Sequence, residues 1–77
     1  SGQDEFYYYD LIGMNVLDEQ NKSVGRVHAV ENYGAGDFLE IIDDDNKIYT
    51  LPFHKHSVKR IDQSSRVMWI DLSFLLH

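Results

Sequence analysis

The stretch FYYYDLIG, residues 6–13, decides where the fold begins. Four consecutive aromatic residues, Phe6 to Tyr9, precede an acid, an apolar pair and a glycine. Tyrosine combines an apolar ring with a hydroxyl group that needs a polar partner, so this run is too polar for a core and too apolar for an ordinary tail. It indicates the boundary at which a packed domain starts. We expect residues 9–12 to form a short turn or helical lead-in rather than a strand.

The sequence is 77 residues long, which is the size of one small domain. A chain of this length buries only about 60% of its unfolded surface. It has no Cys, which excludes disulfides, thiolate-bound metals and thiol nucleophiles. An aromatic content of 13% beside a single Pro favours a compact β-rich domain over a disordered chain. We interpret residues 1–3 as the disordered scar of a removed tag, and residues 4–77 as a domain excised from a longer protein.

The charge balance restricts the class of partner. There are 13 acids against 7 Lys and Arg residues, for a net charge of −6. Nucleic-acid binders usually carry a basic stripe, because much of their affinity comes from phosphate contacts. The only basic clustering lies at residues 54–60, so we expect little direct RNA binding and a basic protein as the partner. No apolar run approaches the roughly 18 residues that span a bilayer, and no secretory signal is visible, so we expect a cytoplasmic domain without membrane contact.

Turn-forming residues recur along the chain and separate short β-rich segments. The turn signals lie at residues 18–23, 32–37, 43–47 and 62–65. The segments rich in β-branched and aromatic residues lie at 14–17, 24–31, 38–42, 48–53, 58–61 and 67–72. No window holds a 3.6-residue apolar stripe. This spacing predicts an all-β fold, a small antiparallel barrel or sandwich of six strands.

Several residues predict local features of these strands. Alternate residues of the segment 67–72 are apolar on both faces, which predicts a central strand that is covered on both sides. Gly25 favours a bulge or a tight corner near the start of its strand. Pro52 cannot donate to a ladder, so its strand should end there or lie at an edge. Ser73 is a candidate N-cap for a short helical turn over residues 73–76.

The candidate sites for chemistry are weak. His54 and His56, two residues apart on a basic turn, would need a third metal ligand, and we interpret them as solvated histidines. The acidic run at 43–46 lacks the glycine and the distant Glu of a calcium loop, so we expect a solvated hairpin tip there. No Ser, His and Asp set or phosphate-binding loop is identifiable. The residues therefore predict no enzyme, no cofactor and no metal site.

Four motifs follow one another in an order that resembles a known family. They are the run at residues 6–13, the pair Val24-Gly25, the stretch IYTLPF at 48–53 and the stretch VMWID at 67–71. In this order they resemble a PRC-barrel domain, and more narrowly the C-terminal domain of the bacterial ribosome maturation factor RimM. The resemblance covers about residues 5–76 and departs from the family pattern at residues 54–56 and 72–75. It implies a six-stranded antiparallel β-barrel, and it implies that the N-terminal RimM domain is absent from this chain.

The same resemblance implies a function. RimM is a non-enzymatic factor that assists maturation of the 30S subunit head and processing of 16S rRNA, and it associates there with the basic ribosomal protein S-nineteen. By position, Tyr7, Tyr8 and Asp10 inherit the role of partner-binding residues in a chain that we expect to be monomeric. The alternative for the two tyrosines is pure packing over an open barrel end. Two other functions stay open: an interaction module of a membrane-associated or photosynthetic reaction-centre-like protein, and an RNA-binding module.

Overall fold

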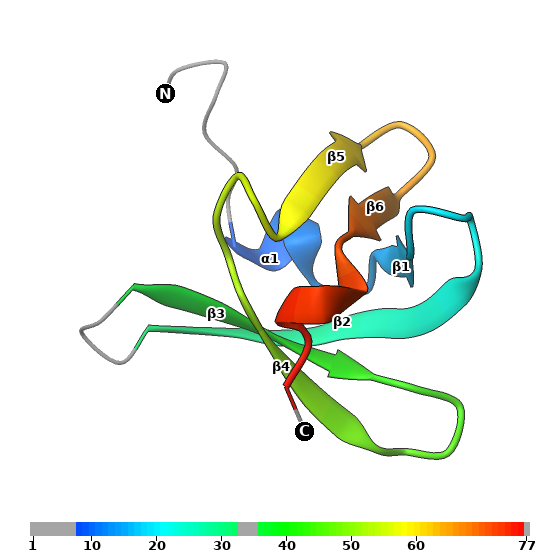
Figure 1. Cartoon of the computed structure of the whole chain (residues 1–77). Helices are drawn as coiled ribbons and strands as arrows, with labels where there is room; N and C mark the ends of the chain where they lie inside the picture. Colours follow the sequence, from blue (N-terminus) through cyan, green and yellow to red (C-terminus); the bar gives the residue numbers. More distant parts are fainter. Residues whose placement is uncertain (1–7, 33–35, 77) are drawn as a thin grey trace.

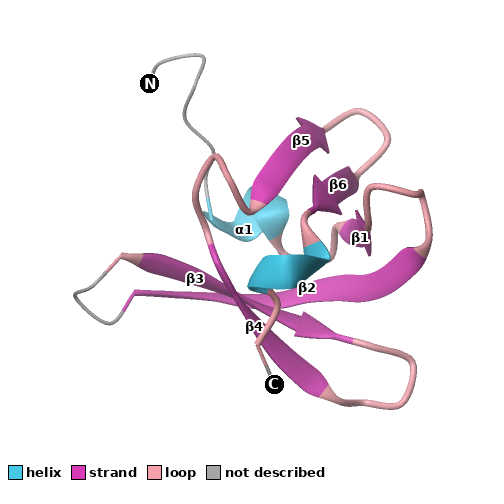
Figure 2. Ribbon diagram, in the orientation of Figure 1, coloured by secondary structure: helices cyan, strands magenta, loops and turns pink. Residues whose placement is uncertain are grey.

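Among the residues that the structure describes, six strands form one sheet, preceded by a short lead-in helix and followed by a 3-10 turn (Figures 1 and 2). The computed structural model describes residues 8–32 and 36–76, without the side chains of Tyr8 and Tyr9. Residues 1–3, which were predicted to be a disordered scar, lie outside the described residues. The elements, in chain order, are α1 (Tyr8–Leu11), β1 (Asn15–Leu17), β2 (Ser23–Asn32), β3 (Asp37–Ile42), β4 (Ile48–Pro52), β5 (Val58–Asp62), β6 (Val67–Ile70) and η1 (Leu72–Phe74).

The predicted positions of the elements are confirmed. Each predicted β-rich segment coincides with one observed strand to within two residues at either end. The lead-in is helical, as expected for the residues before Gly13. β4 ends at Pro52 and lies at an edge of the sheet, because proline has no N–H to donate to a further neighbour.

The prediction that all strand pairs are antiparallel is wrong for one pair. The strand order is β4-β3-β2-β1-β6-β5, and β1 pairs with β6 in parallel, with Val16 opposite Met68. The remaining four pairs are antiparallel. β1 and β6 are joined by all of the intervening strands, so no hairpin turn fixes their relative direction. The alternation of inward and outward residues is the same for either direction, and the sequence pattern did not distinguish them.

The prediction of a closed barrel is also wrong for the described residues, because β4 and β5 stand at opposite edges of the sheet and form no ladder. The outer edge of β4 is instead paired with the C-terminal tail. The Thr50 amide donates to the Leu76 carbonyl at 2.7 Å, and the Leu76 amide donates to the Thr50 carbonyl at 2.8 Å. Figure 1 shows the tail running beside β4 after η1. The tail thus covers hydrogen-bonding groups that a closed barrel would pair with β5.

The core lies between the two halves of the curled sheet and includes residues from α1 and the loop after it. Its fully or nearly fully buried apolar residues are Leu11, Met14, Val16, Val27, Leu39, Ile41, Leu51, Met68 and Ile70. Gly25 lies where β2 bends: the register between β1 and β2 shifts beside it, and an added Cβ would lie 2.3 Å from the Ile42 carbonyl oxygen. The predicted bulge at Gly25 is therefore confirmed, and its physical basis is the close approach of two backbones.

The C-terminal helical turn is confirmed, but its N-cap is Asp71 and not Ser73. Asp71 Oδ1 accepts hydrogen bonds from the Ser73 backbone amide at 2.9 Å and from its hydroxyl at 2.7 Å. The N-cap lies two residues earlier than predicted, and the turn begins one residue earlier, because the ionised carboxylate of Asp71 satisfies the Ser73 amide. These bonds, led by the one from the Ser73 hydroxyl, lower the pKa of Asp71 below its ordinary value.

Candidate partner-binding surface

Two of the three residues predicted to bind a partner, Tyr8 and Asp10, lie at the start of the described part of the chain. Tyr7 lies outside the described residues, and only the backbone of Tyr8 is described, as the first residue of α1. Asp10 lies in the same helix and is half-buried. The roles of the two tyrosines therefore stay predictions, whereas the position of Asp10 can be argued from its surroundings.

The carbonyl end of α1 is held by an arginine that is distant in sequence. The Arg66 guanidinium donates through Nη1 to the Asp10 carbonyl and through Nη2 to the Ile12 carbonyl, the latter at 2.8 Å. A cation at this end of a helix satisfies carbonyls that have no partner within the helix. Arg66 itself has a positive φ of 59° at the end of the β5–β6 turn. The lead-in helix is thereby tied to the β5–β6 hairpin.

The residues after Asp10 fix the helix to the sheet. Leu11 and Met14 have no exposed surface. Between them the chain reverses at Gly13, whose φ is +90° and whose amide donates to the Val27 carbonyl at 2.8 Å. Glycine suits this position because its φ is one that other residues rarely adopt. The Asp-Leu-Ile-Gly motif thus works as an anchor, with the leucine buried and the glycine making the turn into β1.

The two histidines at the β4–β5 turn have structural contacts. His54 Nδ1 accepts hydrogen bonds from the backbone amides of His56 and Ser57, each at 3.2 Å. The His54 ring packs edge-on against Phe74 of η1, with 5.1 Å between ring centroids. Ser57 is fully buried and donates to the Pro52 carbonyl. The side chain of His54 is exposed, as expected, but one of its nitrogens closes the turn and so cannot also bind a metal ion.

The acidic run at residues 43–46 is the hairpin tip between β3 and β4, as predicted. Asp43 Oδ1 accepts from the amides of Asp45 at 2.8 Å and Lys47 at 3.0 Å, and its Oδ2 accepts from the Tyr49 hydroxyl at 3.2 Å. The bond from the Lys47 amide is the largest cause that lowers the pKa of Asp43. Burial, followed by the bond to Asp43, raises the pKa of Tyr49. The Asp43 carboxylate therefore stabilises the β3–β4 turn through hydrogen bonds to both of its oxygens.

The turn predicted at residues 18–23 joins β1 to β2 and has the same structure, a similarity that was not predicted. Asp18 Oδ1 accepts from the amides of Gln20 at 2.8 Å and Lys22 at 3.0 Å, the same offsets as at Asp43. Both turns place an asparagine with positive φ three residues after the aspartate, at 65° for Asn21 and 62° for Asn46. Asparagine tolerates this conformation better than most residues. The shared pattern Asp-x-x-Asn-Lys, present twice, is the signal that identifies both turns.

The outer side of β6 carries an aromatic residue with polar contacts on two sides. β6 is central, between β1 and β5, as predicted, and its Met68 and Ile70 are buried. Trp69 points to the other side and is only half-buried. Its Nε1 donates to Asn21 Oδ1 at 2.7 Å, and the Arg60 guanidinium lies 4.8 Å from the ring centroid. The prediction that both faces of this strand are covered therefore holds fully for one face only.

A cleft of about 200 Å³ lies where the β1–β2 turn meets the end of β6, the strand that contains Trp69. Its lining consists of Asp18, Glu19, Gln20, Asp71 and Leu72. Leu72 is 47% exposed. The cleft thus combines three carboxylates with one apolar wall.

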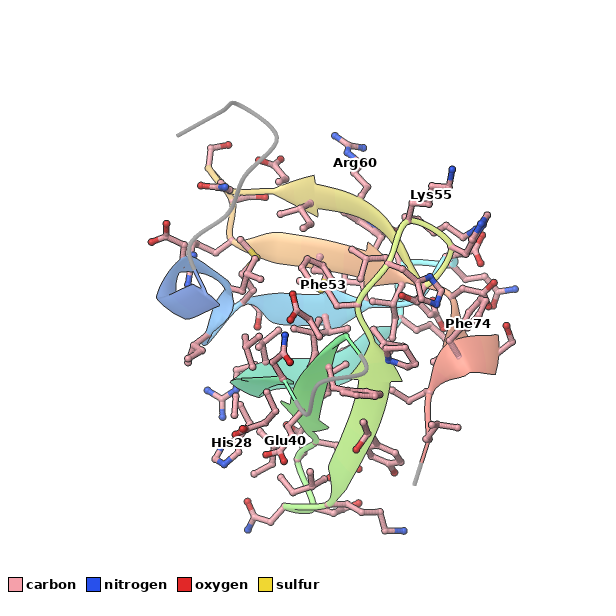
Figure 3. The ribbon with its side chains drawn as sticks, turned by 90° about the vertical axis from the view of Figure 1, so that its left-hand side faces the viewer. His28, Glu40, Phe53, Lys55, Arg60 and Phe74 are labelled. Atoms are coloured by element: carbon pink, nitrogen blue, oxygen red, sulfur yellow. The ribbon has the colours of Figure 1, made fainter. Side chains whose placement is uncertain are left out.

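Two of the positive side chains project away from two polar residues of the β2–β3 pair. Figure 3 shows Lys55 and Arg60 extending from the β4–β5 loop and β5, away from His28 and Glu40.

Among the described residues, no group of three or more His, Cys, Asp or Glu side chains is arranged to hold a metal ion. Within the same part of the chain, no helix has the length and apolarity to cross a membrane.

Comparison with known proteins identifies close relatives. The sequence profile of the family described as the RimM PRC barrel domain matches residues 8–73. The ribosome maturation factor RimM of Chelativorans sp. (strain BNC1) is 48% identical over 69 residues, which are 90% of this chain and 32% of that protein. RimM of Zymomonas mobilis subsp. mobilis is 53% identical over 49 residues, which are 64% of this chain and 30% of that protein. The chain thus spans about a third of the length of these curated relatives.

A solved structure has a similar fold. The crystal structure described as a 16S ribosomal RNA processing protein, RimM, from Pseudomonas aeruginosa superposes with a TM-score of 0.79. The match covers 92% of this chain and 48% of that one, at 23% identity. At this level of identity, the likeness shows a shared fold.

Proposed function

Because the chain belongs to the RimM PRC barrel domain family, we propose that it is a non-enzymatic binding domain of a ribosome maturation factor. In this proposal it assists maturation of the small ribosomal subunit and processing of 16S rRNA. The observation that carries the proposal is the family match over residues 8–73, together with relatives that are themselves named ribosome maturation factor RimM. Since the chain spans only about a third of those relatives, their activity as whole proteins is transferred here as part of the proposal.

The partner proposed for the domain is a basic protein of the subunit head, S-nineteen. The net charge of −6 supports a basic partner, because complementary charge speeds encounter and disfavours wrong partners. Exposed acids are also held in defined turns: Asp18, which is itself buried, and Asp43 each cap a hairpin turn. The exposed acids of these turns are Glu19, Asp44 and Asp45. A charged surface that needs no reordering loses less entropy on binding.

Tyr7, Tyr8 and Asp10 are the proposed contact residues. The structure supports this proposal through the helix α1, to which Tyr8 and Asp10 belong. Buried Leu11 and the bonds from Arg66 fix α1 against the hairpin, so Asp10 and the backbone of Tyr8 have a defined place. Tyrosines on a rigid base are typical of interface hot spots, since they bury a large area at a low entropic cost.

The experiment that tests this proposal is binding of the isolated chain to purified S-nineteen. Replacing Tyr7 and Tyr8 together by Ala should weaken binding at least about 30-fold, which is the cost of one hot spot of about 2 kcal/mol. Tyr49→Phe, which changes a tyrosine on the edge strand β4, is the control and should leave binding unchanged. A folded double variant with unaltered affinity would remove both tyrosines from the interface.

Direct RNA binding is tested separately. Titration of the chain with 16S rRNA fragments should show weak binding, whereas a true RNA-binding domain would show strong affinity that falls steeply with salt. Tight binding of these fragments that weakens steeply with salt would show that the partner of the domain is RNA and not a protein.

A further inference from the structure

The outer side of the β1–β6 pair carries three apolar residues that do not belong to the buried core. Leu17, Val67 and Trp69 point to this side and are half-buried, whereas Val16 and Met68 point to the core. The elements with which β6 makes its main contacts are its sheet neighbours β1 and β5. Half-buried apolar residues on a sheet are common, so exposure alone identifies no site.

The tryptophan on this face is held in one orientation. Asn21 accepts from its indole N–H at 2.7 Å, and Arg60 stacks on its ring. Asn21 belongs to the same turn as Asp18, whose carboxylate also lines the neighbouring cleft. The apolar face and the cleft are therefore joined through one rigid turn.

The cleft has the chemistry to hold a long cationic side chain. Asp18 and Asp71 use Oδ1 for amide and hydroxyl groups of their own turns, and the described part of the chain gives no hydrogen bond to Oδ2 of either. Glu19 has no hydrogen bond among the described residues, and Leu72 supplies an apolar wall. Lysine and arginine lay their aliphatic stems on apolar surface and direct a cationic head to carboxylates.

The cations of the chain itself do not fill the cleft. Arg60 stacks on Trp69, and Lys59 lies near enough to Asp71 to contribute to its lowered pKa, but neither lines the cleft. Three carboxylates also repel phosphate, which disfavours RNA as the occupant.

We propose that this cleft and the adjoining Trp69 form a second contact surface, which receives an arginine or lysine side chain of a basic protein partner. The proposal rests on the proposed function, in which that partner is a protein of the small ribosomal subunit. It adds a surface made by the β1–β2 turn, β6 and η1, formed by residues other than Tyr7, Tyr8 and Asp10.

The chain offers closely matched control variants. Glu19 and Asp44 follow the capping aspartate in the two equivalent turns, so Glu19→Lys and Asp44→Lys change the net charge equally in the same local structure. Leu72 and Ile48 are exposed to 47% and 40%, so Leu72→Ser and Ile48→Ser remove similar apolar surface. Asp18 and Asp71 are left unchanged, because they cap turns.

The first measurement is the affinity of these variants for purified S-nineteen. Glu19→Lys and Leu72→Ser should each weaken binding at least about tenfold relative to their controls, since a contact residue costs more than a distant charge of the same sign. If Glu19→Lys and Asp44→Lys weaken binding equally, the second surface is wrong, while the proposed function stands.

The second measurement uses the only Trp of the chain as a reporter. A hexa-arginine peptide should shift the NMR signal of the Trp69 indole N–H, and Glu19→Lys should abolish the shift while Asp44→Lys preserves it. If the unmodified chain binds no small-subunit protein, the proposed function is wrong. The peptide titration then tests by itself whether the cleft binds arginine side chains. The proposed second surface is wrong if the peptide does not shift the Trp69 signal of the unmodified chain, or if it shifts this signal equally in both variants. Self-association that Glu19→Lys abolishes would assign the cleft to a second copy and overturn it as well.

Discussion

Gly25→Ala tests the close approach of backbones around which β2 bends. An added Cβ would lie 2.3 Å from the Ile42 carbonyl oxygen and 2.9 Å from its carbonyl carbon. To reach an ordinary carbon–oxygen separation of about 3.3 Å, the Ile42 carbonyl would have to retreat by about 1 Å. Ile42 pairs with Arg26 in β2 and with Ile48 in β4, so neither side of β3 can move without loss of ladder geometry.

The expected loss of stability follows from these two effects. Overpacking costs about 1–3 kcal/mol. Weakening one or two ladder hydrogen bonds adds about 1 kcal/mol for each. The free energy of unfolding should therefore fall by about 2–5 kcal/mol, a large part of the roughly 5–15 kcal/mol that holds a domain together. For a domain of this size, the melting temperature should fall by at least about 8 °C.

Thermal and urea unfolding, followed by circular dichroism, measure this loss. The control is Gly36→Ala, because nothing lies within 4 Å of the added Cβ there. Gly36 has a φ of +117°, so its replacement carries only the backbone cost, about 1–2 kcal/mol. If Gly25→Ala lost less than Gly36→Ala, the close approach would not be what requires glycine at the bend.

Two further predictions concern the hairpins. Arg66→Met should lower the free energy of unfolding by about 1–3 kcal/mol, because the carbonyls of Asp10 in α1 and of Ile12 just after it lose a charged donor. Denaturant titration measures this, and a loss below about 0.5 kcal/mol would contradict the anchoring role. Hydrogen bonds lower the folded-state pKa values of Asp43, Asp62 and Asp71, so their contribution to stability is present above the unfolded pKa of about 3.9 and is lost as the pH falls through the folded values. Asp43→Asn keeps an acceptor oxygen but removes the titration, so thermal melts between pH 5 and pH 2.5 should show a shallower loss than the unmodified chain; equal slopes would contradict the assigned cause.

The positions of the strands were predictable because their signals are local. Turn residues bracket each strand, and Pro52 and Gly25 each impose a backbone constraint that holds in any context. The N-cap at Asp71 could also have been predicted, since an aspartate two residues before Ser73 is an equally good N-cap residue. Both turns were predicted from the sequence, but the repeated Asp-x-x-Asn-Lys pattern and the capping role of its aspartate were not, although the pattern is visible there.

Such signals could not predict the parallel β1–β6 pair, nor that the C-terminal tail pairs with the outer edge of β4 in place of β5. They depend on which distant segments meet: Val16 and Met68 are paired across the length of the chain, and Thr50 is bonded to Leu76. The same holds for the candidate site. Arg66 reaches Asp10 from 56 residues away, and Asn21 reaches Trp69 from 48 residues away, so neither contact has a local pattern.

The most direct test of the central claim is the binding of the isolated chain to purified S-nineteen, measured by calorimetry at low and physiological salt. We expect saturable one-to-one binding that weakens with salt and that weakens at least about 30-fold when Tyr7 and Tyr8 are replaced by Ala. A folded chain that shows no binding at either salt concentration would contradict it.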